Sequence, residues 1–319
     1  MQYRRLGRSG LKVSEISLGS WLTIGTSVGE GESKKIIHKA WDMGVNFYDT
    51  ADVYTQGAAE VVLGKAIADL PRNELVVATK CMGRVWPGPM GQGLSRKHVM
   101  DAIDGSLMRL NLDYIDLYQA HAPDGDTPLE ETLSTFNDLV RSGKVRYLGI
   151  SNFTTEETVE VLRICERNGW ESVVSHQPPY NLLDRRVEPN LIPRCRTEGI
   201  GLIVYSPLAQ GILTGKYGSG KRPAGSRATT KWKKFMDKWM EEDDFKKIRV
   251  LQRVSKRKGK SMAQVALAWT LRDPVVSSAI IGATSLDQLK ENLKAIKVRL
   301  TQKDLDELDK GFGQTGNPL

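Results

Sequence analysis

The chain alternates short apolar runs with longer segments in which apolar residues recur about every three or four positions. Short runs bounded by polar residues predict buried strands, whereas the longer periodic segments predict helices with one face against a core. Strict alternation of the two indicates parallel strands joined by helices, and therefore an α/β fold. The expected strands lie near residues 15–18, 46–49, 75–80, 114–120, 147–151, 173–177, 201–205 and 278–281.

Several of the predicted helices begin with residues that commonly cap a helix. Ser95 precedes one helical pattern, and Thr154 with Glu157 forms the pattern of a capping box. Thr127 stands before Pro128 at a further helix start. The expected helices lie near 33–43, 57–68, 96–110, 129–142, 155–168, 188–198, 242–271 and 285–296.

Two segments fall outside this alternation. Residues 3–13 contain two short strand-like pieces around a Gly-containing turn, which predicts a hairpin that plugs one end of the fold. Residues 208–241 are too long for an ordinary connection and are rich in Gly, Lys and Arg. Connections of that length are usually functional or disordered.

Four polar residues, Asp49, Tyr54, Lys80 and His121, stand at or just beyond the ends of successive predicted strands. Barrel enzymes keep their chemistry at that edge, so we expect the four side chains to converge. Together they suit chemistry at a carbonyl oxygen. A phenol with a reference pKa of about 10 becomes useful near neutrality when a neighbouring cation lowers that pKa, and Lys80 is the candidate cation.

Size and charge narrow the class of protein. A chain of 319 residues and 35.5 kDa can form one large α/β domain, which we expect to span residues 1–319. The formal charge of +8 permits an anionic partner, and much of it lies between Lys216 and Lys260. Most of those cations suit a solvated loop and helix face. No nucleic-acid module is recognisable, so nucleic acid is not an expected partner.

The three cysteines, Cys81, Cys165 and Cys195, are odd in number and lack metal-ligand spacing, which argues against a disulfide framework and a zinc site. We expect reduced thiols and no bound metal. No stretch has the length and hydrophobicity of a membrane span, and the start lacks the apolar segment of a secretory signal. The expectation is a soluble, cytoplasmic protein, with oligomeric state open and a homo-oligomer included.

Several motifs make the chain resemble the aldo-keto reductase superfamily. Residues 44–54 resemble the first family motif, and residues 150–153 and 205–208 match later ones. The resemblance runs from the hairpin to the last barrel helix. Within the superfamily, the segments 93–98, 211–217 and 226–228 are most similar to a branch that contains bacterial reductases and voltage-gated potassium channel β subunits.

This resemblance implies a fold and a reaction. The fold would be a (β/α)8 TIM barrel with an N-terminal hairpin and a long loop that covers the cofactor. The reaction would be NADPH-dependent reduction of aldehydes or ketones. Tyr54 would donate the proton, Lys80 would lower its pKa, Asp49 would hold Lys80 by an ion pair, and His121 would orient the carbonyl.

The resemblance also implies which residues hold the nicotinamide and the pyrophosphate. Amide and hydroxyl groups would fix the carboxamide, an aromatic ring would stack on the nicotinamide, and cations would pair with the phosphates. The carboxamide would contact Ser151, Asn152 and Gln177, and the stacking ring would be Tyr205. The pyrophosphate would lie along Ser206, Leu208, Gly211 and Lys216, and Arg227 would cover it. The cofactor-binding set also includes Ser20, Trp21, Asp49 and Pro207.

The adenosine end would lie in residues 281–292. Gly282 belongs to this site, Thr284 and Gln288 would meet the 2′-phosphate, and Glu291 and Asn292 would meet adenine. Many family members carry Arg where this chain has Gln288. We expect NADP(H), with NAD(H) as the alternative.

The substrate pocket includes Tyr54 and His121, and the indoles of Trp21 and Trp86 either wall it or pack within its rim. His38, His98 and His176 lack a comparable set around them, so we expect structural roles. The alternative function is a nucleotide-binding, redox-sensing regulatory subunit similar to the channel partners. Channel β subunits generally replace the histidine of the catalytic set, whereas this chain keeps His121, which favours turnover of a small carbonyl substrate.

Overall fold

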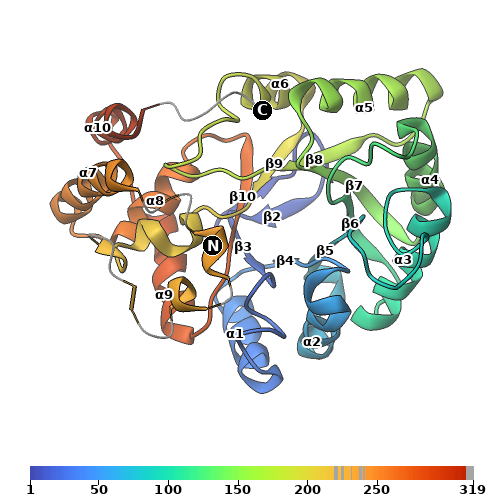
Figure 1. Ribbon diagram of the computed structural model, residues 1–319, viewed down its shortest axis with the longest axis horizontal. Coiled ribbons are helices and arrows are strands. Elements are labelled where there is room, and N and C mark those ends of the chain that lie inside the picture. The colour runs from blue at the N-terminus through green and yellow to red at the C-terminus, as the bar shows by residue number, and fades with distance from the viewer. Residues whose placement is uncertain (219–221, 224–225, 231, 237–238, 240, 314–319) are drawn as a thin grey trace.

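Parallel strands close into a barrel that helices surround (Figure 1). The computed structural model describes residues 1–313 except 219–221, 224–225, 231, 237–238 and 240. In the described chain the barrel order is β10-β3-β4-β5-β6-β7-β8-β9. This confirms the predicted (β/α)8 barrel and each predicted strand. The strands are β3 Ile16–Gly19, β4 Phe47–Asp49, β5 Val76–Cys81, β6 Ile115–Ala120, β7 Val145–Ser151, β8 Val173–Gln177, β9 Gly201–Val204 and β10 Val276–Ile281.

Most of the helices form the layer around the strands because they bury an apolar face against the barrel, whereas α10 packs on α7. None of the described helices is both long enough and apolar enough to cross a membrane. The helices are α1 Glu30–Asp42, α2 Ala58–Ile67, α3 Arg96–Leu110, α4 Leu129–Arg141, α5 Thr155–Asn168, α6 Leu191–Glu198, α7 Glu242–Lys258, α8 Met262–Thr270, α9 Leu286–Leu293 and α10 Gln302–Phe312.

The single helix predicted over 242–271 is wrong, because the chain forms α7 and α8 there. Gly259 ends α7 in the left-handed conformation, with a φ of 60°, and the Ser261 side chain caps α8 by accepting from the Gln264 N–H. The sequence did not lead us to expect α10 either. This helix packs beside α7 at one edge of the ring, where Arg257 pairs with Asp304 at 2.7 Å (Figure 1).

Two predicted caps are confirmed, and α4 begins directly after Pro128, near the predicted helix start. The Ser95 side chain accepts from the His98 N–H at the start of α3, and Thr154 with Glu157 forms a complete capping box at α5. Thr127 does not cap α4. Its hydroxyl donates instead to Asp124 Oδ2 at 2.7 Å, which uses the side chain within the preceding loop.

The predicted hairpin consists of β1 Tyr3–Arg5 and β2 Lys12–Ser14, and it plugs the barrel as expected. Leu6 and Val13 are fully buried among side chains of the barrel interior. The hairpin backbone also accepts hydrogen bonds from the start of β10, including one from Ser278 Oγ to the Ser14 carbonyl at 2.8 Å. Gly7 is needed for this approach, because a Cβ there would lie 2.3 Å from the Gly199 carbonyl oxygen.

The described parts of the long connection contain short 3-10 turns, η3 Ala209–Thr214, η5 Arg227–Thr229 and η6 Lys233–Phe235. Met236 and Trp239 are buried against the main core, so this part of the connection packs on the barrel. This connection leaves the carboxyl end of β9, on the side of the barrel where the carboxyl ends of the other parallel strands lie.

Candidate active site

The four predicted catalytic residues come from neighbouring strands. Asp49 is the last residue of β4, Lys80 is next to last in β5, and His121 directly follows β6. Tyr54 begins the 3-10 turn η1 Tyr54–Gly57 beyond β4. Because the carboxyl ends of parallel barrel strands share one rim, the structure brings the four side chains together as the sequence predicts.

The Lys80 ammonium is fixed by two acceptors. Its Nζ donates to Asp49 Oδ2 and to the Thr50 carbonyl, both at 2.7 Å. Lys80 is fully buried and Asp49 is 3% exposed. The second carboxylate oxygen, Asp49 Oδ1, accepts from Gln177 Nε2 at 2.8 Å. A buried ion pair of this kind is stable only when both charges have further partners, and here both do.

The Tyr54 ring lies beside both Lys80 and His121. Lys80 Nζ is 5.2 Å from the centre of the Tyr54 ring, and the His121 ring meets it edge-on with centres 5.6 Å apart. Burial, together with Asp49 and Asp52, holds the pKa of Tyr54 well above its usual value. Burial and the two carboxylates set the direction of this shift, and the lowering expected from Lys80 stays a prediction.

His121 is neutral at physiological pH. Burial and the nearby Lys80 ammonium lower the pKa of its imidazole to about 3. Its backbone N–H donates to the Cys81 carbonyl at 3.0 Å, and its carbonyl accepts from Asn152 Nδ2 at 2.9 Å, so the residue is anchored by its backbone on both sides. A neutral imidazole can donate one hydrogen bond to a substrate oxygen.

We expect the His121 imidazole to show no protonation between about pH 5 and about pH 8, the interval in which an ordinary histidine titrates. The measurement is an NMR titration of protein with isotopically labelled histidine. A His121→Asn variant assigns the resonance by its loss. A midpoint inside that interval would contradict the neutral imidazole.

The residues predicted for the nicotinamide carboxamide are joined to this set by hydrogen bonds. Ser151 Oγ donates to the Gln177 carbonyl at 2.8 Å, and Tyr205 Oη donates to Asn152 Oδ1 at 2.8 Å. Since Gln177 also holds Asp49, the Asp49–Lys80 pair and the predicted cofactor residues form one network. Side-chain amides and hydroxyls of this kind fit a carboxamide, which both donates and accepts.

Ser20, Trp21 and Trp86 occupy different surroundings. Ser20 and Trp21 follow β3, and Ser20 Oγ donates to Thr50 Oγ1 at 2.8 Å, next to the Lys80 anchor. The Trp86 ring packs on His98 with centres 4.8 Å apart. This contact supports packing within the rim for Trp86 and a structural role for His98.

The residues predicted for the pyrophosphate lie in a turn after β9. Ser206, Ala209, Gln210 and Gly211 all have positive φ angles, and Gln210 Nε2 donates to Ser206 Oγ at 2.6 Å. A Cβ on Gly211 would come within 3.1 Å of Lys216 Nζ, so the backbone and the cation lie together. Pro207 and Leu208 sit inside this turn. The side chain of Arg227 lies outside the residues whose side chains the structure describes.

The predicted adenosine site lies at the start of α9. The Thr284 N–H and hydroxyl both donate to Gln288 Oε1 at 3.0 Å, so two residues assigned to the 2′-phosphate pair with one another. Asn292 is 7% exposed, and the Glu291 carbonyl accepts from Gln264 Nε2 at 3.3 Å. Gly282 directly follows β10. A Cβ at this position would lie 3.0 Å from the Thr23 side chain, so the backbone packs closely there.

Two residues of the site were missed from the sequence. The Thr50 carbonyl is an anchor for Lys80, but every residue has a carbonyl and no pattern marks this one. Asp52 is fully buried two positions before Tyr54, although an aspartate in a predicted loop is normally exposed. The only available signal was its place in the first family motif.

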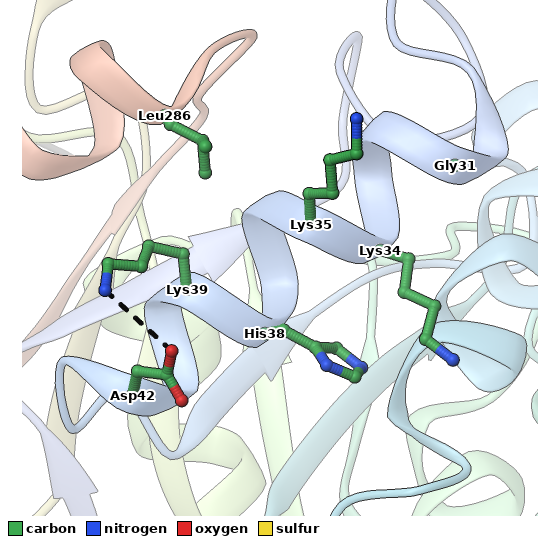
Figure 2. A pocket seen from close by; sticks show the side chains of 7 residues that line it. All are labelled: Gly31, Lys34, Lys35, His38, Lys39, Asp42 and Leu286. Atoms are coloured by element: carbon green, nitrogen blue, oxygen red, sulfur yellow. Dashed lines mark ion pairs between the residues drawn. The ribbon is translucent and has the colours of Figure 1, made fainter.

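A hollow of about 390 Å³ on the outer surface of α1 is separate from this site. Figure 2 shows its lysine and histidine side chains leaving α1 in different directions, with Lys39 paired to Asp42. His38 Nε2 lies 2.9 Å from the Ala66 carbonyl and 3.0 Å from Asp69 Oδ1, which agrees with a structural role. None of the four candidate catalytic residues lines the hollow.

The cysteines and His176 lie in the packed interior of the described chain. No group of three or more His, Cys, Asp or Glu in that part of the chain is arranged to hold a metal ion. Cys81, Cys165 and Cys195 are buried and unbridged, as expected for reduced thiols. His176 is fully buried in β8, where burial lowers the pKa of its imidazole to about 3, in agreement with a structural role.

Comparison with known proteins identifies the family. The model of the aldo/keto reductase family matches residues 15–311. A probable voltage-gated potassium channel subunit beta from Oryza sativa is 40% identical over 97% of this chain and 96% of its own, and one from Arabidopsis thaliana is equally similar over the same shares. L-glyceraldehyde 3-phosphate reductase from Escherichia coli is 38% identical over 97% of this chain and 92% of its own. The chain therefore belongs to the aldo/keto reductase family.

Proposed function

We propose that this protein is an NADPH-dependent reductase of aldehydes or ketones. The observation that carries the proposal is the placement of the Tyr54 ring beside both His121 and the buried Lys80–Asp49 pair. Family membership supports an oxidoreductase activity and a small-molecule substrate. The amide and hydroxyl groups of Ser151, Asn152 and Gln177 suit a nicotinamide carboxamide.

When bound, NADPH supplies the hydride that adds to the carbonyl carbon. The raised pKa keeps the Tyr54 phenol protonated at neutral pH, ready to donate its proton to the substrate oxygen. The Lys80 ammonium then stabilises the tyrosinate that remains, and Asp49 keeps the ammonium in place. Neutral His121 donates a hydrogen bond that orients the carbonyl.

A substrate screen that follows NADPH absorbance tests this function. The panel includes L-glyceraldehyde 3-phosphate, because the Escherichia coli relative is named for its reduction, together with L-glyceraldehyde and aromatic aldehydes and ketones. Oxidation of NADPH with at least one carbonyl compound is the expected result. If the protein binds NADPH tightly but no compound of the panel causes NADPH oxidation, the proposed reductase function is rejected.

That negative result would favour the second candidate, a nucleotide-binding regulatory subunit. The plant relatives are named as probable potassium channel β subunits, so the family membership alone does not decide between the two. The retained His121 next to Tyr54 favours turnover. Stopped-flow mixing of the NADPH-bound protein with the panel detects even one slow turnover, which a purely regulatory subunit would not show.

We propose NADP(H) rather than NAD(H), and Gln288 gives a direct test. A neutral amide binds a dianionic 2′-phosphate less strongly than a guanidinium, which can make two charge-assisted hydrogen bonds. Gln288→Arg should therefore tighten NADPH binding by about tenfold or more. NADH lacks the 2′-phosphate and is the internal control. Equal changes for the two nucleotides, measured by fluorescence titration, would remove Gln288 from the phosphate site.

A further inference from the structure

Asp52 carries a buried carboxyl group that lacks a well-formed hydrogen bond. The residue is fully buried, and within the described part of the chain neither of its carboxyl oxygens makes a hydrogen bond of normal geometry, although the Val53 N–H is near enough to favour the charged form. Its backbone N–H donates to the Lys80 carbonyl at 3.1 Å, which ties the residue to β5. It stands in the short connection between Asp49 and Tyr54. The carboxyl group is therefore shielded from solvent on a residue that is tied to Lys80 and lies two positions before Tyr54.

The nearby cations already have other partners. Lys80 Nζ is held by Asp49 and the Thr50 carbonyl. Arg109 Nε donates to Glu60 Oε2 at 2.7 Å, and the other Glu60 oxygen accepts from Thr79 Oγ1 at 2.6 Å. An ionised Asp52 would thus be an uncompensated buried charge beside a second buried carboxylate. Such a charge is costly, whereas a neutral carboxylic acid is much less so.

The groups around Asp52 come from several elements. Glu60 of α2 and burial raise the pKa of Asp52 to about 8, with burial the larger cause, and the opposing Val53 N–H, Arg109 and Lys80 do not overcome them. Ionised Asp52 in turn raises the pKa of three neighbouring acids. These are the phenol of Tyr54, the thiol of Cys81 and the phenol of Tyr118, which belong to η1, β5 and β6.

We propose that Asp52 is a positioning residue that is held as a neutral carboxylic acid behind Tyr54 and Lys80, and that its ionisation sets the alkaline limit of carbonyl reduction. The reaction part of this inference rests on the proposed function. When Tyr54 gives up its proton, the site gains a negative charge. With Asp52 neutral, Asp49, Glu60 and the new tyrosinate are the negative charges near the Lys80 ammonium. With Asp52 ionised, a further negative charge opposes proton donation.

The Asp52→Asn variant keeps the shape of the acid and removes its ionisation. We expect wild-type kcat for reduction to fall as the pH rises through about 8, and the pH profile of the variant to lack this fall. Asp116→Asn is the matched control, because Asp116 is buried but paired with Arg72 at 2.6 Å. Its profile should keep the wild-type alkaline fall. An unchanged alkaline fall in Asp52→Asn would overturn the inference.

Two measurements decide the ionisation state without any substrate. Infrared difference spectra of wild type minus Asp52→Asn should contain the carbonyl band of a neutral carboxylic acid at pH 7, and the band should vanish at alkaline pH. Denaturant unfolding gives the second. The folded pKa of about 8 lies above the ordinary value of 3.8. The stability that protonation of Asp52 supplies is therefore lost progressively as the pH rises between these two values and is gone above about 8. Wild type should lose stability relative to Asp52→Asn across that range.

The outcomes separate the two proposals. Absence of the neutral band at pH 7 would overturn the inference about Asp52 even if the protein reduces carbonyl compounds. A neutral band together with failure of the whole substrate panel would reject the proposed function and the alkaline limit on reduction, while confirming that Asp52 is held neutral.

Discussion

Tyr54→Phe is expected to slow NADPH-dependent carbonyl reduction by at least about 100-fold, the low end of what general acid catalysis contributes. The substitution removes the phenolic oxygen that donates the proton and keeps the ring that packs beside Lys80 and His121. NADPH affinity should be nearly unchanged, because the residues predicted to hold the cofactor are other ones. Single-turnover kinetics with saturating NADPH measure the loss in the chemical step.

Tyr3→Phe is the matched control for that experiment. Tyr3 is 50% exposed in the hairpin, and its hydroxyl donates to the Gly44 carbonyl, away from the candidate catalytic residues. Its activity should stay at the wild-type level. Comparable single-turnover rates for Tyr54→Phe and wild type would remove Tyr54 from the role of proton donor and leave the mechanism proposed above without its acid.

Lys80→Met is expected to lower both activity and stability. Removing the ammonium leaves the Asp49 carboxylate buried without its cation, which costs about 3 to 5 kcal/mol of the free energy of unfolding. Reduction should also fall by about 100-fold or more, because no cation remains to stabilise tyrosinate. Denaturant unfolding and steady-state kinetics measure the two effects separately.

The double variant Asp49→Asn/Lys80→Met separates folding from chemistry. With both charges gone, no unpaired ion is buried, and the asparagine oxygen can still accept from Gln177 Nε2. Most of the lost stability should return, since removing both members of a buried pair is often nearly neutral. Activity should stay low. Recovery of activity together with stability would show that Lys80 acts only in folding.

The sequence predicted the barrel well because its strands are continuous apolar runs separated by periodic helices. The break between α7 and α8 was missed although Gly259 and Ser261 carry the usual end and start signals. Residues 255–261, around this break, hold no apolar side chain, which is a further sign of it. The short helix α10 was missed because its buried face holds few residues, among them Leu308 and Phe312.

Some residues of the site could likewise be predicted from the sequence, whereas the contacts between them could not. Asp49, Lys80 and His121 were found because strand ends can be located from periodicity, and parallel strands bring their carboxyl ends together. The network that joins Asp49 to Gln177 links residues 128 positions apart, and no local pattern contains it. The raised pKa of Tyr54 also depends on burial and on the surroundings of Asp52, which only the packed structure defines.

The hairpin that closes the barrel has a consequence for the order of events in catalysis. With Leu6 and Val13 filling the amino-terminal mouth, ligands of the proposed reaction exchange at the opposite mouth, where the strand ends meet. The nicotinamide would lie against Gln177 at the rim of the barrel, and the carbonyl compound would come between it and solvent. Cofactor should then arrive first and depart last.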